Sequence, residues 1–268
     1  MLVRIVAALV MLPLFFVVIY IFPQIMLVIT VSLIAAYAVY EIIWQTGFFL
    51  RMFSVAVSLV FVGAIPFLVH FNVKFEFYIL IVFLYTLILF SEGILRPKTV
   101  TLERISVLFF VSVFVSLFFA CVLKIKAMDN GNALIPIPFI GAFVSDTAAY
   151  FVGSFLGKHK LCPEISPKKS VEGAVGGLVG GMLGMVIFCL ILNSFFEYSY
   201  NYFVFAAIGF VLSVVSQIGD LSMSFIKREY NVKDFSNLIP GHGGVLDRFD
   251  GVLFALPVAY VVLICVCL

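Results

Sequence analysis

Residues 224–250, SFIKREYNVKDFSNLIPGHGGVLDRFD, form the polar segment around which the apolar rest of the chain is arranged. This segment is polar and contains glycine, although long apolar runs precede and follow it. Its Lys, Arg, Asp, Glu and His residues are Lys227, Arg228, Glu229, Lys233, Asp234, His242, Asp247, Arg248 and Asp250. Charges that only solvate a long loop are the simpler alternative. The density of acids, bases and glycines favours a functional site.

The turn Pro240–Gly244 directly precedes the apparent start of a helix. Free backbone N–H groups and the positive end of a helix dipole favour phosphates and other anions. We therefore expect Gly241, Gly243 and Gly244 to lie close to a phosphate. His242 is expected to donate to a phosphate or to act as an acid or base; a hydrogen bond that only shapes the loop is the alternative.

Four aspartates are candidate metal ligands. Asp247 and Asp250 are three residues apart, so on a helix they share a face and can converge on one cation. Asp220, at the end of the preceding apolar run, is a third ligand. Asp146 lies inside an apolar segment, where a carboxylate is costly and usually faces a polar cavity or a partner. A hydrogen bond in helix packing is the alternative for Asp146.

Composition places most of the chain in a lipid bilayer. Of its 268 residues 64% are hydrophobic and 11% charged, whereas soluble domains have about 25% charged residues. The mean hydropathy is +1.25. The five cysteines form no C-x-x-C pair and there are three histidines, so we expect neither a disulfide framework nor a zinc site.

Apolar runs of about 20 residues predict an all-α polytopic membrane protein with about nine transmembrane helices. The first run could be a signal peptide, but it is longer than a typical hydrophobic region of about 7–15 residues. We expect one integral membrane domain, in which 1–131 form a scaffold or dimerisation part and 132–268 the catalytic part. The predicted spans are 3–22, 25–43, 52–71, 76–92, 104–124, 132–156, 172–193, 200–220 and 250–268.

The basic residues predict the topology. With alternating loops, 13 Lys and Arg residues fall on the side of the N-terminus and three (Lys74, Lys124 and Lys126) on the other. By the positive-inside rule, the N-terminus and the loops 157–171 and 221–249 are cytosolic. Both loops thus face the same side, as a shared, cytosol-facing polar cavity requires.

Residues 173–184 contain six glycines, with repeated Gly-x-x-x-Gly spacing. This pattern predicts close helix packing and not a nucleotide-binding loop, because the run is continuous with apolar sequence. Before it, Lys168 and Lys169 stand at a probable helix start, where they can meet a triphosphate or a lipid phosphate. General attraction to anionic lipid is the alternative for these lysines.

Two blocks of sequence resemble the phosphatidate cytidylyltransferase (CDP-diacylglycerol synthase) family. One consists of S-F-I-K-R (224–228), K-D (233–234) and L-I-P-G-H-G-G-V-L-D-R-F-D (238–250). The other consists of S-D-T (145–147), G-K-H-K (157–160) and I-S-P-K-K-S-V-E-G (165–173). The chain departs from the family at Met223, where many members have an acidic residue.

The resemblance implies transfer of a cytidylyl group from CTP to phosphatidic acid in the cell membrane. It also implies Mg²⁺, with a monovalent cation such as K⁺ as a further option, and a homodimer; nucleic acid is not an expected partner. Predicted catalytic residues are Asp220, Asp247, Lys227, Arg228, Arg248 and His242. Predicted substrate-binding residues are Lys168, Lys169, Ser222, Ser224, Lys233, Asp234, Gly241, Gly243 and Gly244, and predicted metal ligands are Asp220, Asp247, Asp250 and Asp146.

Two alternatives remain from the residues themselves. The D-R-F-D-G segment contains fragments of the CDP-alcohol phosphotransferase pattern, but the chain lacks that family's second aspartate pair. A cation-coupled transporter would use Asp146 and Asp220 as ion ligands within the membrane, but no inverted repeat is visible.

Overall fold

The computed structural model describes residues 17–47, 52–236, 238 and 243–267. Within these ranges the chain is predominantly helical, with one short β-hairpin. The elements are a π-helix η1 (Val17–Ile21), α2 (Gln24–Gln45), α3 (Met52–His70), α4 (Phe75–Leu95), α5 (Leu102–Lys126), α6 (Gly131–Leu134), α7 (Ile137–Leu156), β1 (Lys160–Cys162), β2 (Ser166–Ser170), α8 (Val171–Phe195), α9 (Tyr202–Glu229) and α10 (Leu246–Cys267).

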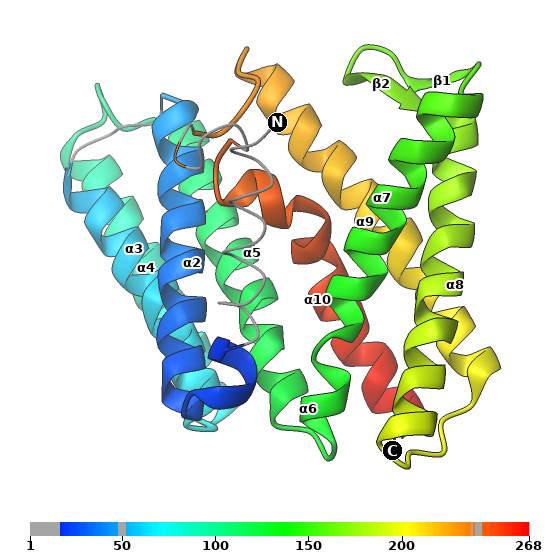
Figure 1. The fold of residues 1–268 in the computed structure, drawn as a ribbon. Helices are drawn as coiled ribbons and strands as arrows, with labels where there is room; N and C mark the ends of the chain where they lie inside the picture. Colours follow the sequence, from blue (N-terminus) through cyan, green and yellow to red (C-terminus); the bar gives the residue numbers. More distant parts are fainter. Residues whose placement is uncertain (1–16, 48–51, 237, 239–242, 268) are drawn as a thin grey trace. The chain divides into compact units, whose positions relative to one another are not determined.

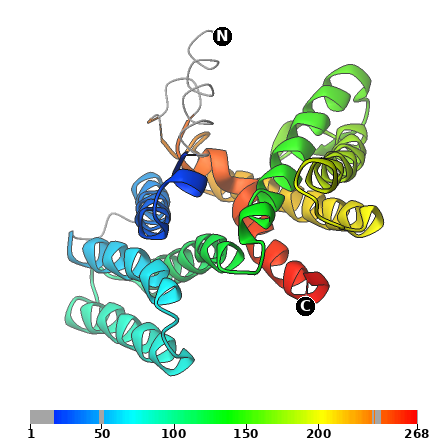
Figure 2. The same ribbon diagram turned by 60° about the horizontal axis from the view of Figure 1, so that its bottom comes forward.

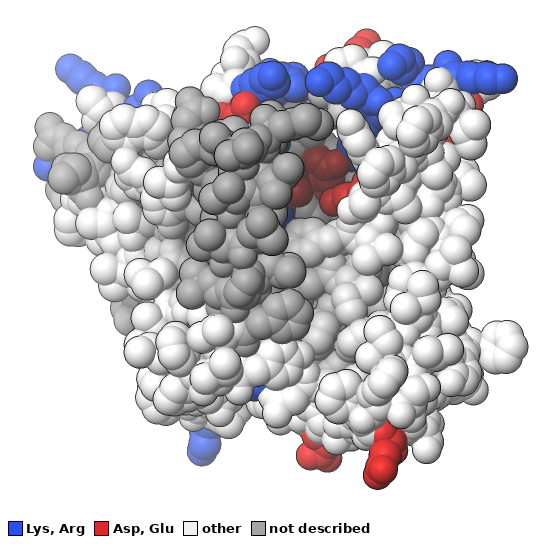
Figure 3. All heavy atoms as spheres, in the orientation of Figure 1, with Lys and Arg blue, Asp and Glu red and all other residues white. Residues whose placement is uncertain are grey.

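Eight helical segments in the described ranges are long and apolar enough to cross a membrane. They confirm the predicted all-α polytopic class, because a chain in lipid must pair its backbone polar groups within each helix. The predicted first span, 3–22, lies mainly outside the described residues. Most of the surface in Figure 3 is neither acidic nor basic, as lipid contact requires. The chain is a multi-pass membrane protein.

One local prediction was wrong: helix α9 continues to Glu229, so residues 221–229 are helical and not part of a loop. The predicted loop 157–171 contains the antiparallel pair β1–β2. In contrast, α10 begins at Leu246, so Asp247 and Asp250 lie in its first turns, as predicted.

Side-chain caps and asparagine turns mark several helix ends. Ser170 accepts a hydrogen bond from the backbone N–H of Gly173 at the start of α8, and Asn201 accepts one from Phe203 at the start of α9. Asn72 and Asn231 follow α3 and α9 with φ of 49° and 55°. Asparagine tolerates this left-handed conformation better than most residues, so it can reverse the chain where a helix stops.

The chain divides into two compact units, each described by itself. The first contains Met1–Lys124 and Asp234–Arg248, and the second contains Ile125–Lys233 and Phe249–Leu268. The segment 224–250 is therefore divided between them.

A buried polar network joins three helices of the first unit. The hydroxyl of Tyr85 in α4 lies 2.7 Å from that of Ser58 in α3 and donates to Ser112 in α5 over 3.0 Å. The Tyr85 ring stacks on Phe61 with centroids 4.3 Å apart. Hydrogen bonds between helices stabilise membrane bundles, where apolar side chains gain little by leaving lipid for protein.

In the second unit, α8 packs against both α7 and α9 (Figures 1 and 2). A Cβ atom added at Gly176 would lie 2.5 Å from Val152 of α7, and one added at Gly184 would lie 2.8 Å from Val144. A Cβ atom added at Gly209 of α9 would lie 2.6 Å from the carbonyl oxygen of Gly181. These distances confirm the prediction that the glycines serve close packing.

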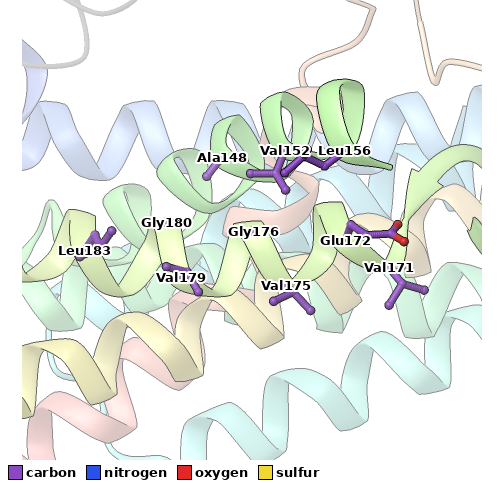
Figure 4. Close-up of a pocket in the computed structure, with 10 residues that line it drawn as sticks. All are labelled: Ala148, Val152, Leu156, Val171, Glu172, Val175, Gly176, Val179, Gly180 and Leu183. Atoms are coloured by element: carbon purple, nitrogen blue, oxygen red, sulfur yellow. The ribbon is translucent and has the colours of Figure 1, made fainter. Parts of the chain in front are cut away.

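Beside this contact, α7 and α8 enclose an apolar groove of about 640 Å³. Ala148, Gly176 and Gly180 belong to its lining, and Glu172 lies towards one end (Figure 4). The Glu172 carboxylate accepts hydrogen bonds from the backbone N–H groups of Lys158 and His159. Glu172 therefore fixes the chain between α7 and β1.

Candidate active site

The β-hairpin gives its two neighbouring lysines different environments. In β2, Lys168 is exposed, whereas the side chain of Lys169 is half-buried and forms an ion pair with Asp220 of α9. Successive residues of a strand point to opposite faces, which separates the two side chains. Of the predicted pair, Lys169 alone contacts Asp220 in the structure.

Three aspartates of the second unit form one charged cluster. Asp146 of α7 interacts electrostatically with Asp220 and Lys169. Asp250 of α10 interacts with Asp220, Asp146 and Lys227. We call these five residues the aspartate–lysine cluster.

The donor chemistry of this cluster fits Mg²⁺. In the described part of the chain, no three His, Cys, Asp or Glu side chains lie close enough together to hold an ion by themselves. Mg²⁺ commonly takes one or two carboxylates and completes its shell with water and substrate phosphate oxygens. Asp146 in the middle of α7, Asp220 in the second half of α9 and Asp250 in the first turns of α10 are separate carboxylates suited to such shared coordination.

Helix α9 directs a polar stripe into the second unit. Ser216, Asp220, Ser224 and Lys227 follow one another at helical spacing, and Ser224 and Lys227 are buried. Ser222 is half-buried and donates to the carbonyl of Ile218, so the two predicted serines differ in environment.

The position where the family resemblance predicts an acid is part of the core. Met223 is 1% exposed and contributes an apolar side chain to the interior. The carboxylates of the cluster come instead from α7, from α9 one turn earlier and from α10.

Sequence reasoning missed Gln217 of α9, which connects this helix to α7 and α8. Its amide donates to the hydroxyl of Ser145 over 3.4 Å and to the carbonyl of Ala174 over 3.1 Å. Its position three residues before Asp220 was the available signal, because it places both on one side of α9.

Arg228 has a supporting role in the structure. Its Nε donates to the carbonyl of Ile165, in the hairpin connection, over 3.2 Å. A second bond, 3.3 Å long, runs from Nη1 to the carbonyl of Val232. Lys233, also predicted to bind substrate, is exposed.

In the first unit, Asp247 closes the turn that precedes α10. Its Oδ2 accepts the N–H groups of Phe235 and Gly244, each over 2.9 Å. Gly243 has a φ of 83°, and a Cβ atom added there would lie 2.9 Å from Asp247 Oδ2. Glycine is needed at this position for both reasons.

Sequence reasoning also missed Glu41 of α2, a carboxylate within the apolar run 25–43. It is 1% exposed, and its Oε1 and Oε2 accept the N–H groups of Val245 and Leu246, each over 2.9 Å. The only sequence signal was a lone acid inside a predicted membrane span.

The predicted site residues thus fall into distinct groups. The structure brings together Asp146, Asp220, Asp250, Lys169 and Lys227. Asp234, Gly243, Gly244, Asp247 and Arg248 belong to the first unit, where Asp234 is exposed. Gly241 and His242 lie outside the described residues. That Asp247 and Arg248 join the cluster stays a prediction.

Known proteins resemble this chain in sequence. The model of the cytidylyltransferase family matches residues 2–266. A phosphatidate cytidylyltransferase of Bacillus subtilis (strain 168) is 35% identical over 178 residues, which are 66% of this chain and 65% of that protein.

Staphylococcal relatives match over shorter segments. The phosphatidate cytidylyltransferase of Staphylococcus haemolyticus (strain JCSC1435) is 35% identical over 136 residues, 51% of each chain. That of Staphylococcus aureus (strain COL) is 34% identical over 139 residues, 52% of each chain. The chain spans about half to two thirds of the length of the curated relatives it matches. Because the family model covers nearly all of it, the chain belongs to the cytidylyltransferase family.

Proposed function

We propose that this protein transfers the cytidylyl group of CTP to phosphatidic acid, which gives CDP-diacylglycerol and pyrophosphate. The observation that carries the proposal is the aspartate–lysine cluster in a membrane protein of the cytidylyltransferase family. The names of the curated relatives supply the lipid acceptor.

The reaction needs no nucleophile from the protein. A phosphate oxygen of phosphatidic acid forms the bond to the α-phosphorus of CTP. The bond from that phosphorus to the oxygen bridging to the β-phosphate breaks, and pyrophosphate leaves with the electron pair. Protein groups then need to bind and orient the two phosphates and take up developing charge.

Lys169 and Lys227 are suited to phosphate binding. Lys169 pairs with Asp220 and Lys227 interacts with Asp250, so these carboxylates would hold the ammonium groups in place before substrate arrives. Such preorganisation avoids the cost of reorienting charges during the reaction.

Asp146, Asp220 and Asp250 would hold Mg²⁺, with a monovalent cation such as K⁺ as a further proposal. When bound, Mg²⁺ would polarise the triphosphate and neutralise charge on the leaving pyrophosphate. The carboxylates would orient the ion and balance the two lysines.

We further propose a cytosolic active site in the cell membrane. The excess of Lys and Arg on the predicted side of the loops 157–171 and 221–249 supports this orientation. A homodimer is proposed from the family resemblance alone, and the mass of the detergent-solubilised protein would test it.

Purified protein incubated with CTP labelled at the α-phosphate, phosphatidic acid and Mg²⁺ tests the proposal. We expect label in the lipid extract that requires all three components and is lost with EDTA. Absence of lipid label from folded protein would contradict it. Conversion of CDP-diacylglycerol with an alcohol acceptor, with release of CMP, would point to the phosphotransferase instead.

A further inference from the structure

Glu41, far from residues 224–250 in sequence, contacts the part of that segment that belongs to the first unit. Glu41 lies near the end of α2 and is 1% exposed. A buried carboxylate is unfavourable unless hydrogen bonds replace its lost hydration. The hydrogen-bond donors around the Glu41 carboxylate therefore indicate the role of this residue.

Three donors converge on Glu41, all from residues 236–246. Oε1 accepts the N–H of Val245 over 2.9 Å and the hydroxyl of Ser236 over 2.5 Å. Oε2 accepts the N–H of Leu246 over 2.9 Å. Backbone N–H groups in the first turn of a helix have no partner within it, so Glu41 supplies the cap that α10 needs.

Glu41 and Asp247 act on the same turn from two sides. Asp247 accepts the N–H of Gly244, and Glu41 accepts those of the next two residues, Val245 and Leu246. A Cβ atom added at Gly244 would lie 2.5 Å from Glu41 Oε1. The backbone is therefore fixed over three consecutive residues, immediately before Asp247 and Arg248.

We infer that Glu41 is a positioning residue for cytidylyl transfer, acting through the turn 243–246 and the first turn of α10. This inference rests on the proposed function. Glu41 contacts the hydroxyl of Ser236 and the N–H groups of Val245 and Leu246, so it would act through this turn and not on the substrate. Its effect is to fix the backbone from which the predicted catalytic residues Asp247 and Arg248 extend.

A second buried carboxylate provides a matched control. Glu92, in α4 of the same unit, is 7% exposed and contacts the hydroxyl of Ser54 and, at 3.7 Å, Arg96. Both glutamates lie near the end of a membrane helix, but within the described residues Glu92 contacts Ser54 of α3 and Arg96 at the end of α4. Loss of a buried charge alone should affect both positions similarly.

The test compares Glu41→Ala, Glu41→Gln and Glu92→Gln with the unaltered protein. For Glu41→Ala we expect kcat, per folded protein, to fall by about 10- to 100-fold, as loss of hydrogen bonds to a charged group suggests. The KM for phosphatidic acid should change little. Glu41→Gln keeps one carbonyl acceptor and should recover part of the rate, and Glu92→Gln should retain it.

Hydrogen exchange gives a readout that does not depend on turnover. Peptides containing Val245 and Leu246 should exchange faster in Glu41→Ala, whereas peptides from α7 and α8 should not change. The inference is wrong if this exchange is unaltered, or if activity falls only in proportion to the folded fraction. It is also wrong if Glu92→Gln loses as much kcat as Glu41→Gln.

The proposed function can fail separately. If the unaltered, folded protein forms no CDP-diacylglycerol, the proposed reaction is contradicted, and with it the assignment of Glu41 to that reaction. If the unaltered protein is active and Glu41→Ala is equally active, only the inference about Glu41 falls.

Discussion

At the scale of single residues, burial and pairing separate side chains that the sequence places next to each other. Lys168 and Lys169 are both candidate phosphate ligands by sequence. Only Lys169 is half-buried and paired with Asp220 in the structure. The two residues therefore form a natural pair for mutation.

We predict that Lys169→Ala lowers kcat about 100-fold or more, because it removes a preorganised positive charge from the cluster. Lys168→Ala should stay within a few-fold of the original rate, since an exposed lysine contributes mainly general attraction to anionic lipid. Initial rates of lipid-extractable label at saturating CTP would measure both. Equal losses in the two variants would contradict the assignment of Lys169.

Asp220→Asn should lower kcat about 100-fold or more. It removes the carboxylate that interacts with Lys169, Asp146 and Asp250. Asp129→Asn is the control, since Asp129 belongs to the same unit but is exposed between α5 and α6. Rates per folded protein and the Mg²⁺ concentration for half-maximal rate would be compared. A fully active Asp220→Asn protein would remove this carboxylate from the site.

At the scale of elements, the helices were predictable and the connections were not. Lipid excludes unpaired backbone, so apolar runs of sufficient length had to form helices. The β1–β2 hairpin has no such constraint: it is short, polar and partly exposed. The role of Glu41 was also hidden, because its partners lie about 200 residues further along the chain.

The glycine face of α8 gives a prediction at this scale. Gly176→Leu places a branched side chain against Val152, which should destabilise the α7–α8 contact by about 1–3 kcal/mol. Val179→Leu, on an exposed position of the same helix, should have little effect. Thermal unfolding in detergent would measure both. Equal melting temperatures for Gly176→Leu and the unaltered protein would show that the contact tolerates expansion.

At the scale of the whole molecule, the distribution of Lys and Arg along the chain predicts an orientation in the membrane, which composition alone does not. The excess of Lys and Arg on one side predicts that the loops 157–171 and 221–249 face the same aqueous compartment, and this orientation stays a prediction. The aspartates of α7, α9 and α10 were predicted to meet, and Asp146, Asp220 and Asp250 do interact. Their joint use of one metal ion stays a prediction, as does the participation of Asp247.

Cysteine labelling tests this orientation. In a background without the native cysteines, Lys158→Cys should react with a membrane-impermeant maleimide only when the cytosolic side is accessible. Glu197→Cys, in the connection between α8 and α9, should react in intact cells. The reverse pattern would place the aspartate–lysine cluster at the outer side and contradict the proposed orientation.

The β1–β2 hairpin also limits how this chain can change length during evolution. Side chains along a strand alternate between two faces, so a one-residue shift of β2 against β1 would exchange the orientations of the two lysines. Lys168 would then face Asp220, and Lys169 would face water. Homologues with an active cluster should accordingly vary in residue type between 161 and 167 far more readily than in the number of residues there.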